Sequence, residues 1–162
     1  MNKEYKKYIQ SALSRRKENK RVVHRLKKMK PALLNKLINN MHAEAFEIID
    51  CLECANCCSS ISPAVTDNDI SKISKHLRKK PNKVVQEYML LDNDKDYVMN
   101  RTPCPFLMLD NCCSIYDSRP LACKGYPHTD HNKMHQILQL TLRNTEVCPA
   151  VCYIFERLNS IK

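Results

Sequence analysis

Four cysteines fall within eight residues, and this cluster limits the possible fold more than any other feature of the chain. They are Cys51, Cys54, Cys57 and Cys58, in a sequence of 162 residues with ten cysteines in all. A packed core does not need thiols at this density, whereas zinc and iron–sulfur centres use thiolate ligands at such spacings. The spacing therefore predicts a tight loop that directs two or three thiolates at one metal.

Cys57 and Cys58 are adjacent in the sequence, which complicates their assignment to a single metal site. In an extended stretch, neighbouring side chains point to opposite sides of the backbone. We therefore expect one of these thiols to serve the first site, and the other to serve a second site or the core.

Composition excludes several other classes of protein. Gly125 is the one glycine in the sequence, which excludes Gly-rich phosphate loops and dinucleotide fingerprints. No apolar run is long enough to span a membrane. The first residues have no apolar stretch of the kind found in secretory signals, so a cytoplasmic location is expected. In a reducing compartment, many cysteines favour metal or redox chemistry over disulfides.

The positive charge is confined to the first part of the chain. Residues 1–30 hold 12 Lys and Arg against Glu4 and Glu18, which accounts for the whole net charge of +10. Such an arm could bind nucleic acid through the phosphates or lie on an anionic membrane. The alternative is a solvated helix face, the usual role of a run of charges.

Hydrophobic spacing predicts three regions. These are a basic arm of one or two helices over 1–30, an amphipathic helix over 31–49, and a cysteine-cluster metal-binding domain over 50–162. Within the arm, the apolar pattern changes phase near residues 17–20. Pro31 fits the first turn of the second region.

The third region is expected to combine short helices and strands. A capping-box pattern starts at Thr66 and a second short helix starts at Pro81. Residues 133–142 fit either a helix or a strand, and Pro149 fits the start of a last helix. Predicted strands lie at 97–100, 106–109 and 113–116, with turns at 92–96 and 110–111. The fold class predicted is therefore α+β, mostly helical, with a short β-hairpin and Cys-rich metal-binding loops.

The second half of the sequence supplies further candidate ligands. They are Cys104, Cys112, Cys113, Cys123 and Cys148. If Cys112 and Cys113 begin a strand, their side chains alternate between its two faces, so only one of them should be a ligand.

These motifs, in this order, resemble the CxxCxxCC, or YkgJ-type, cysteine-cluster family. The similar pattern is Cys51-x2-Cys54-x2-Cys57-Cys58, then Cys104-Pro-Phe-Leu, then Cys113-Ser-Ile-Tyr-x2-Arg119-Pro120-x2-Cys123-x2-Tyr126-Pro127. The resemblance covers about residues 50–152. It implies zinc or iron chelation. A bacterial flagellin lysine methylase contains a similar cluster, so the resemblance does not imply one substrate.

By position, the resemblance implies eight metal ligands. They are Cys51, Cys54, Cys57, Cys58, Cys104, Cys113, Cys123 and Cys148. The cofactor implied is zinc or iron, including a [4Fe–4S] cluster, at one or two sites. Cys112 and Cys152 have no counterpart, and we interpret them as small apolar residues. Ala55 replaces the family's usual glycine, and it would strain the loop if this position has a positive φ.

Basic and histidine side chains are secondary candidates. Arg101, Arg119 and Lys124 lie near ligand candidates and could offset the −2 charge of a metal held by four thiolates. The run His128-x2-His131-x3-His135 could place three imidazoles on one helix face, as a second metal site or a base. The alternative is three solvent-facing histidines.

The function expected is metal binding. One alternative is an iron–sulfur redox or methyl-transfer component, in which Tyr126, His128 or Arg119 would be reactive-site groups. Another is a nucleic-acid-associated module that uses residues 1–30. No Ser/His/Asp order, P-loop or His-Glu-x-x-His motif indicates a particular reaction.

Overall fold

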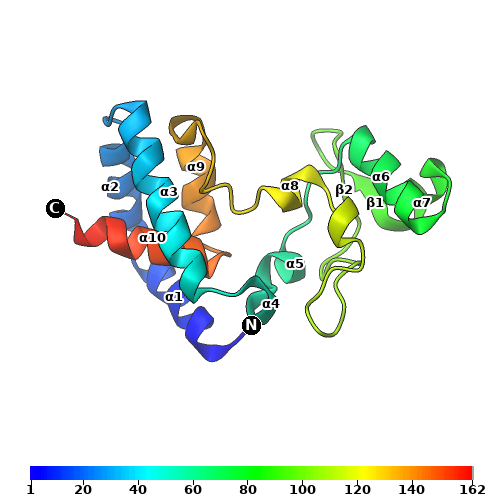
Figure 1. Ribbon diagram of the computed structural model, residues 1–162, viewed down its shortest axis with the longest axis horizontal. Helices are drawn as coiled ribbons and strands as arrows, with labels where there is room; N and C mark the ends of the chain where they lie inside the picture. The colour runs from blue at the N-terminus through cyan, green and yellow to red at the C-terminus, as the bar shows by residue number, and fades with distance from the viewer. Residues whose placement is uncertain (162) are drawn as a thin grey trace. The chain divides into compact units, whose positions relative to one another are not determined.

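A computed structural model describes residues 1–161 of the chain (Figure 1). The chain is mostly helical, and its strands form a two-stranded sheet. This confirms the predicted α+β class. In order, the elements are α1 (Lys3–Ser14), α2 (Arg16–Leu26), α3 (Pro31–Ile48), α4 (Cys51–Cys54), α5 (Asn56–Ser60), α6 (Asp67–Leu77), α7 (Pro81–Tyr88), β1 (Met89–Leu91), β2 (Tyr97–Met99), the 3₁₀ helix η1 (Tyr116–Ser118), α8 (Leu121–Lys124), α9 (Met134–Asn144) and α10 (Pro149–Ser160).

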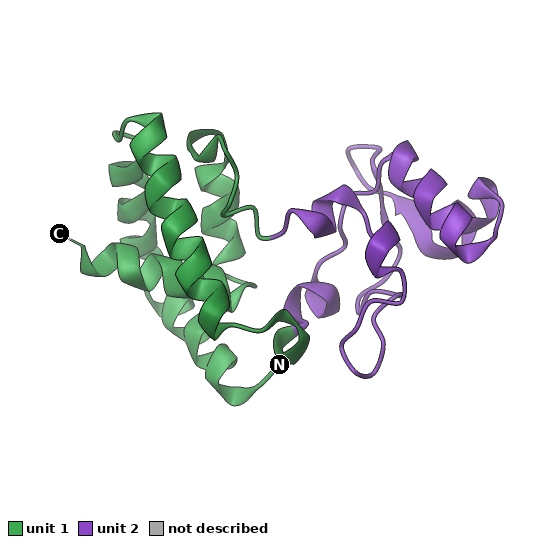
Figure 2. Cartoon of the chain, in the orientation of Figure 1, with its two compact units in different colours: residues 1–54, 127–162 green, residues 55–126 purple. Residues whose placement is uncertain are grey.

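The chain divides into two compact units (Figure 2). Unit 1 contains residues 1–54 and 127–162, and unit 2 contains residues 55–126. The division predicted from the sequence, into a basic arm, an amphipathic helix and a cysteine-cluster domain with boundaries after residues 30 and 49, remains a prediction.

Unit 1 is built from helices. The basic arm forms two of them, as predicted, but the break falls at Arg15 rather than near residues 17–20. The Asn2 side chain caps α1 by accepting a 2.9 Å hydrogen bond from the Tyr5 N–H. Residues 31–48 form the predicted amphipathic helix, with Pro31 in its first turn and Leu34, Ile38 and Met41 buried.

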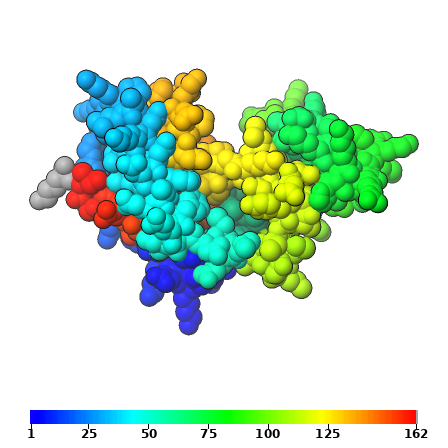
Figure 3. Space-filling view, viewed as in Figure 1, coloured from blue at the N-terminus to red at the C-terminus, as the bar shows by residue number. Residues whose placement is uncertain are grey.

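The core of unit 1 lies where α10 packs against α1, α2 and α3, while α9 packs against α2 and α3. The space-filling view shows α3 (cyan) beside α10 (red) (Figure 3). Phe155 and Leu158 of α10, with Leu26 and Leu34, are among the largest fully buried side chains. Residues 133–142, which fitted either a helix or a strand, lie largely within α9.

Unit 2 has shorter elements around a smaller core. The core residues are Val65, Ile70, Ile73, Val84, Met89, Met99, Phe106 and Ile115. The predicted capping box is present at the start of α6, where Thr66 and Asp69 cap each other. β1 pairs with β2 in antiparallel register, Met89 opposite Met99. The Asp92 side chain accepts hydrogen bonds from the N–H groups of Asp94 and Asp96 in the predicted turn.

The hairpin is therefore β1–β2, and the predicted strands at 106–109 and 113–116 are wrong. Residues 106–114 form an isolated bridge, Leu107 to Cys113, in place of a strand pair. Turn hydrogen bonds occupy donors that a longer ladder would need, such as Leu107 N–H to Cys104 O at 3.0 Å and Tyr116 N–H to Cys113 O at 3.1 Å. β1 was not predicted because its three apolar residues directly follow α7 and carry no turn signal between them and the helix.

Candidate metal centre

The first cysteine cluster folds into two single-turn helices rather than an extended loop. α4 carries Cys51 and Cys54, and α5 carries Cys57 and Cys58. Ala55 joins them in the left-handed conformation, at φ 45° and ψ 17°. This is the positive φ at which alanine, unlike glycine, costs about 1–2 kcal/mol. The predicted strain at the position where the family usually has glycine is therefore present.

Cys57 and Cys58 do not point to opposite sides, so the expectation based on an extended backbone is wrong. Their sulfur atoms lie 4.0 Å apart in α5. Two thiolates bound tetrahedrally to one zinc at 2.3 Å would be about 3.8 Å apart. A hydrogen bond from the Cys57 side chain lowers the pKa of Cys58 to about 7, against the opposing effect of burial. Adjacency therefore does not prevent the two thiols from sharing one ion.

A backbone hydrogen bond connects this cluster to the downstream cysteines of unit 2. The Cys104 N–H donates to the Cys58 carbonyl at 2.8 Å. The bridge between Leu107 and Cys113 folds the following turn back, and Cys104 and Cys113 both pack against the core of unit 2. Segments that are about 45 residues apart in sequence thus meet at these thiols.

Electrostatic effects extend this group to Cys123 in α8. Burial, together with smaller contributions from negative charge at Cys58, Cys104 and Cys113, raises the pKa of the Cys123 thiol to about 12. The Cys104 and Cys113 pKa values are also raised, mainly by burial, with Cys58 contributing to both. Unit 2 therefore brings four predicted ligands, from four different segments, within electrostatic range of one another.

Unit 1 groups three other predicted ligands. Burial raises the pKa of Cys148 to about 12, and the Cys54 and Cys51 thiols contribute in the same direction. The backbone N–H groups of Ala150 and Val151 oppose this rise, because Cys148 is the N-cap residue of α10 and they point toward its sulfur. Cys51, Cys54 and Cys148 are thus neighbours in the fold.

Within residues 1–161, no three or more His, Cys, Asp and Glu side chains lie in positions that would together hold a metal ion. The electrostatic effects place the thiols near one another, and the chemistry of the donor set fits zinc or iron. Thiolates are ligands of both metals.

Comparison with known proteins agrees with this chemistry. Residues 50–153 match the family model CxxCxxCC, described as a "putative zinc- or iron-chelating domain". The chain belongs to the CxxCxxCC family. The match includes all eight predicted ligands and supports metal binding as the general function. No curated protein and no solved structure gave a significant match.

Arg119 is the basic residue that the structure connects to the ligands of the CxxCxxCC domain. Its positive charge lowers the pKa of both Cys113 and Cys123, against the effect of their burial. The guanidinium lies 3.7 Å from the centre of the Tyr116 ring and donates to the Tyr116 carbonyl at 2.7 Å. Arg119 is thus held where it can offset thiolate charge, as the sequence suggested. Lys124 instead donates to the Asp117 carbonyl at 3.1 Å.

The two cysteines outside the family pattern have different surroundings. The Cys112 pKa is raised by desolvation and by the Asp110 carboxylate. Cys152 is fully buried in α10, where its thiol donates to the Thr145 carbonyl at 2.9 Å. Burial raises its pKa.

The histidine run does not form a helix face. His128 has a positive φ of 66°, and α9 begins at Met134, so His135 is the member of the run that lies in a helix. The His131 ring accepts a hydrogen bond from the Lys133 N–H at 3.0 Å. Burial lowers the pKa of His128. Residues 128–133 form turns and irregular backbone ahead of α9.

Two other histidines have partners that the sequence analysis missed. His42 Nδ1 lies 2.7 Å from Thr129 Oγ1, and His76 Nε2 lies 3.1 Å from the Ser114 carbonyl. These contacts span 87 and 38 residues, and no local motif reveals them.

No helix among the described residues is both long enough and apolar enough to cross a lipid bilayer.

Proposed function

We propose that the CxxCxxCC domain binds zinc through thiolates, with the principal site in unit 2. Its ligands are Cys58, Cys104, Cys113 and Cys123. The observation that supports this set most strongly is that the Cys58 thiol contributes to the raised pKa values of Cys104, Cys113 and Cys123, which lie on three other segments of unit 2. The 2.8 Å hydrogen bond from Cys104 N–H to the Cys58 carbonyl holds two of the ligand segments together.

Four sulfur donors suit a tetrahedral structural zinc site, which has no open coordination position. Each thiol must lose its proton on binding, and Cys58, with a pKa of about 7, loses it most readily. Cys57 is an alternative donor because its sulfur is 4.0 Å from that of Cys58. Arg119 offsets part of the negative charge of the occupied site.

Cys51, Cys54 and Cys148 form a second proposed set of ligands, in unit 1. Their support is the effect of the first two thiols on the Cys148 pKa. The N–H groups at the start of α10 favour a thiolate at Cys148. The protein is thus proposed to hold one metal in unit 2 and a second through this set.

Analysis of the metal content of anaerobically purified protein tests the proposal. Elemental analysis, acid-labile sulfide and the visible spectrum are measured on the same sample. We expect stoichiometric zinc, no sulfide and no colour. Iron with equimolar sulfide, and broad absorbance that dithionite bleaches, would replace zinc with a [4Fe–4S] cluster on the same thiols. No stoichiometric metal would contradict the proposal.

Two neighbouring cysteines provide a matched test of the ligand set. Cys113→Ser should remove the metal of unit 2, because serine does not replace a soft thiolate. Cys112→Ser, one residue away, should leave the metal content unchanged because the Cys112 side chain interacts with Asp110 instead. Equal metal loss in both variants would show that this assignment is wrong.

A further inference from the structure

The first two helices expose their charges and bury their apolar residues. Tyr5, Ile9, Val22, Val23 and Leu26 are buried in unit 1. All 12 Lys and Arg residues of this segment are exposed: Lys3, Lys6, Lys7, Arg15, Arg16, Lys17, Lys20, Arg21, Arg25, Lys27, Lys28 and Lys30. Most of this positive charge therefore lies on the folded helices α1 and α2 with a fixed helical spacing.

Few of these charges are neutralised within the protein. Among the described residues, Arg16 is the one cation of this segment that forms a salt bridge, to Glu146 at 3.0 Å. Arg25 donates to the Leu158 carbonyl at the end of α10. The other cations remain available to an external anion.

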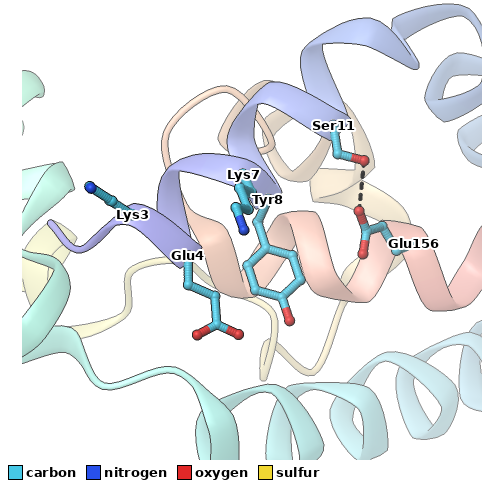
Figure 4. A pocket seen from close by; sticks show the side chains of 6 residues that line it. All are labelled: Lys3, Glu4, Lys7, Tyr8, Ser11 and Glu156. Atoms are coloured by element: carbon cyan, nitrogen blue, oxygen red, sulfur yellow. Dashed lines mark hydrogen bonds between the residues drawn. The ribbon is translucent and has the colours of Figure 1, made fainter.

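Two surface hollows of unit 1 differ in their suitability for an anion. The hollow between α2 and α9 has a volume of about 270 Å³, and its lining contains no carboxylate: Lys20, Val23, His24, Lys27, Gln139 and Leu142. The hollow between α1 and α10 contains two carboxylates (Figure 4): its lining is Lys3, Glu4, Lys7, Tyr8, Ser11 and Glu156. Because Glu4 and Glu156 balance its two lysines, the second hollow is a poor anion site.

We propose that the exposed face of α2, together with the groove between α2 and α9, binds the phosphate backbone of nucleic acid. Lys20 of α2 and Lys27, its C-cap residue, line the groove. Lys17 and Arg21 extend the positive surface along α2, and Lys28 follows just beyond its end. Binding through phosphates is independent of base sequence and depends strongly on salt.

The burial of the apolar residues favours nucleic acid over a lipid surface. A helix that lies on a membrane inserts its apolar face among the lipids. In this protein the apolar face of α2 packs against α9 and α10, where Val22, Val23 and Leu26 are at most 3% exposed. It could not enter a bilayer unless unit 1 came apart.

The test is a binding measurement on the full chain, as purified, by fluorescence anisotropy. The probes are a labelled 20-nucleotide single-stranded RNA of mixed sequence and the DNA of the same sequence, each from about 50 to 300 mM KCl. Lys20→Gln/Lys27→Gln removes two charges from the groove. Lys3→Gln/Lys7→Gln is the matched control, with the same charge change at the hollow that contains carboxylates. Far-UV circular dichroism verifies that each variant remains folded.

The groove variant should bind roughly 20- to 30-fold more weakly than the parent near 0.1 M salt. Its log–log salt slope should be less steep by about 1.4, or 0.7 for each lost phosphate contact. The control variant should lose less than half as much binding free energy as the groove variant. Tight binding of RNA alone, or of DNA alone, identifies which nucleic acid is preferred and supports the proposal.

Three results would overturn the proposal that this surface binds nucleic acid. The first is binding that does not depend on salt, and the second is equal loss in both variants. The third is binding to vesicles of one part phosphatidylserine to three parts phosphatidylcholine with no binding to either oligonucleotide. None of these results bears on the metal content, so this proposal and the metal site succeed or fail separately.

Discussion

The two units of this protein differ in charge, in the length of their elements and in their cysteines. Unit 1 has a formal charge of +8 and helices of 11 to 18 residues, apart from the single turn α4. Unit 2 has a formal charge of +2, three-residue strands, and α-helices of 4 to 11 residues. Long helices bury enough apolar surface to stabilise a bundle, whereas short elements gain less from packing. The comparison indicates that the folding of unit 2 depends on its proposed metal more than the folding of unit 1 depends on its own.

Metal removal should produce the largest difference between the units. A chelator such as EDTA should expose the backbone amides of unit 2 to hydrogen exchange, while those of α3 and α10 stay protected. Structural zinc contributes about 10–16 kcal/mol in small domains whose folding depends on it, and a part of that free energy should be lost here. Hydrogen exchange with mass spectrometry, before and after chelation, measures the effect. Equal deprotection of both units would contradict the comparison.

A cavity in α3 should be the next largest effect. Leu34→Ala removes a fully buried side chain from the unit 1 core and should cost about 2–5 kcal/mol of unfolding free energy. Leu33→Ala, at a neighbouring position that is 57% exposed, should change stability by less than about 0.5 kcal/mol. Urea denaturation of the zinc-loaded protein is the measurement. If unit 1 folds without help from the metal, the cost of Leu34→Ala should be the same after chelation.

The pH dependence of the metal-free protein should follow its buried thiols. The pKa of Cys148 is raised in the folded state from 9.0 to about 12, so its contribution to stability is complete below pH 9. That contribution is lost as the pH rises from about 9 to about 12. About 1 kcal/mol of it is already lost at pH 10. Stability of the metal-free chain should therefore decline over this range. Cys148→Ala in unit 1 should make the decline shallower. A decline unchanged in this variant would show that other groups cause it.

The smallest effect should come from the residue that joins α4 to α5. Ala55→Gly removes the cost of a positive φ and should stabilise the zinc-loaded protein by about 1 kcal/mol. Ala43→Gly, at an exposed position inside α3, should instead destabilise it by about 1 kcal/mol. Opposite changes in the urea midpoint would confirm that the left-handed conformation at Ala55 carries strain. Destabilisation by both changes would show that it does not.

Local patterns predicted most of the helices, and they failed where contacts between distant residues decide the structure. Pro31 and Pro149 marked two helix starts, and Thr66 marked the capping box, because each acts within one turn of its own backbone. The strand predicted at 106–109 failed because nearby N–H groups pair in turns with Cys104 and Cys113. Whether this segment forms a turn or a strand ladder depends on the distant residues that pack against it, and the local sequence pattern does not show those contacts.

For the candidate site, the sequence supplied the residues but not their grouping. It named eight cysteines and the position of Ala55, because thiol spacing and a departure from a family motif can be read directly from the chain. Only the fold separated Cys58, Cys104, Cys113 and Cys123 from Cys51, Cys54 and Cys148. It also placed the sulfurs of Cys57 and Cys58 4.0 Å apart, where an extended backbone would have separated them.

The sequence by itself determined the chemistry of this protein, namely a thiol-rich domain preceded by a basic segment. Charge and sulfur content are properties of residues and need no structure to be known. The tertiary structure decided which thiols are neighbours and which cations face solvent. The physical reason is that both depend on contacts between residues far apart in the chain, such as Cys58 with Cys104 and α2 with α9.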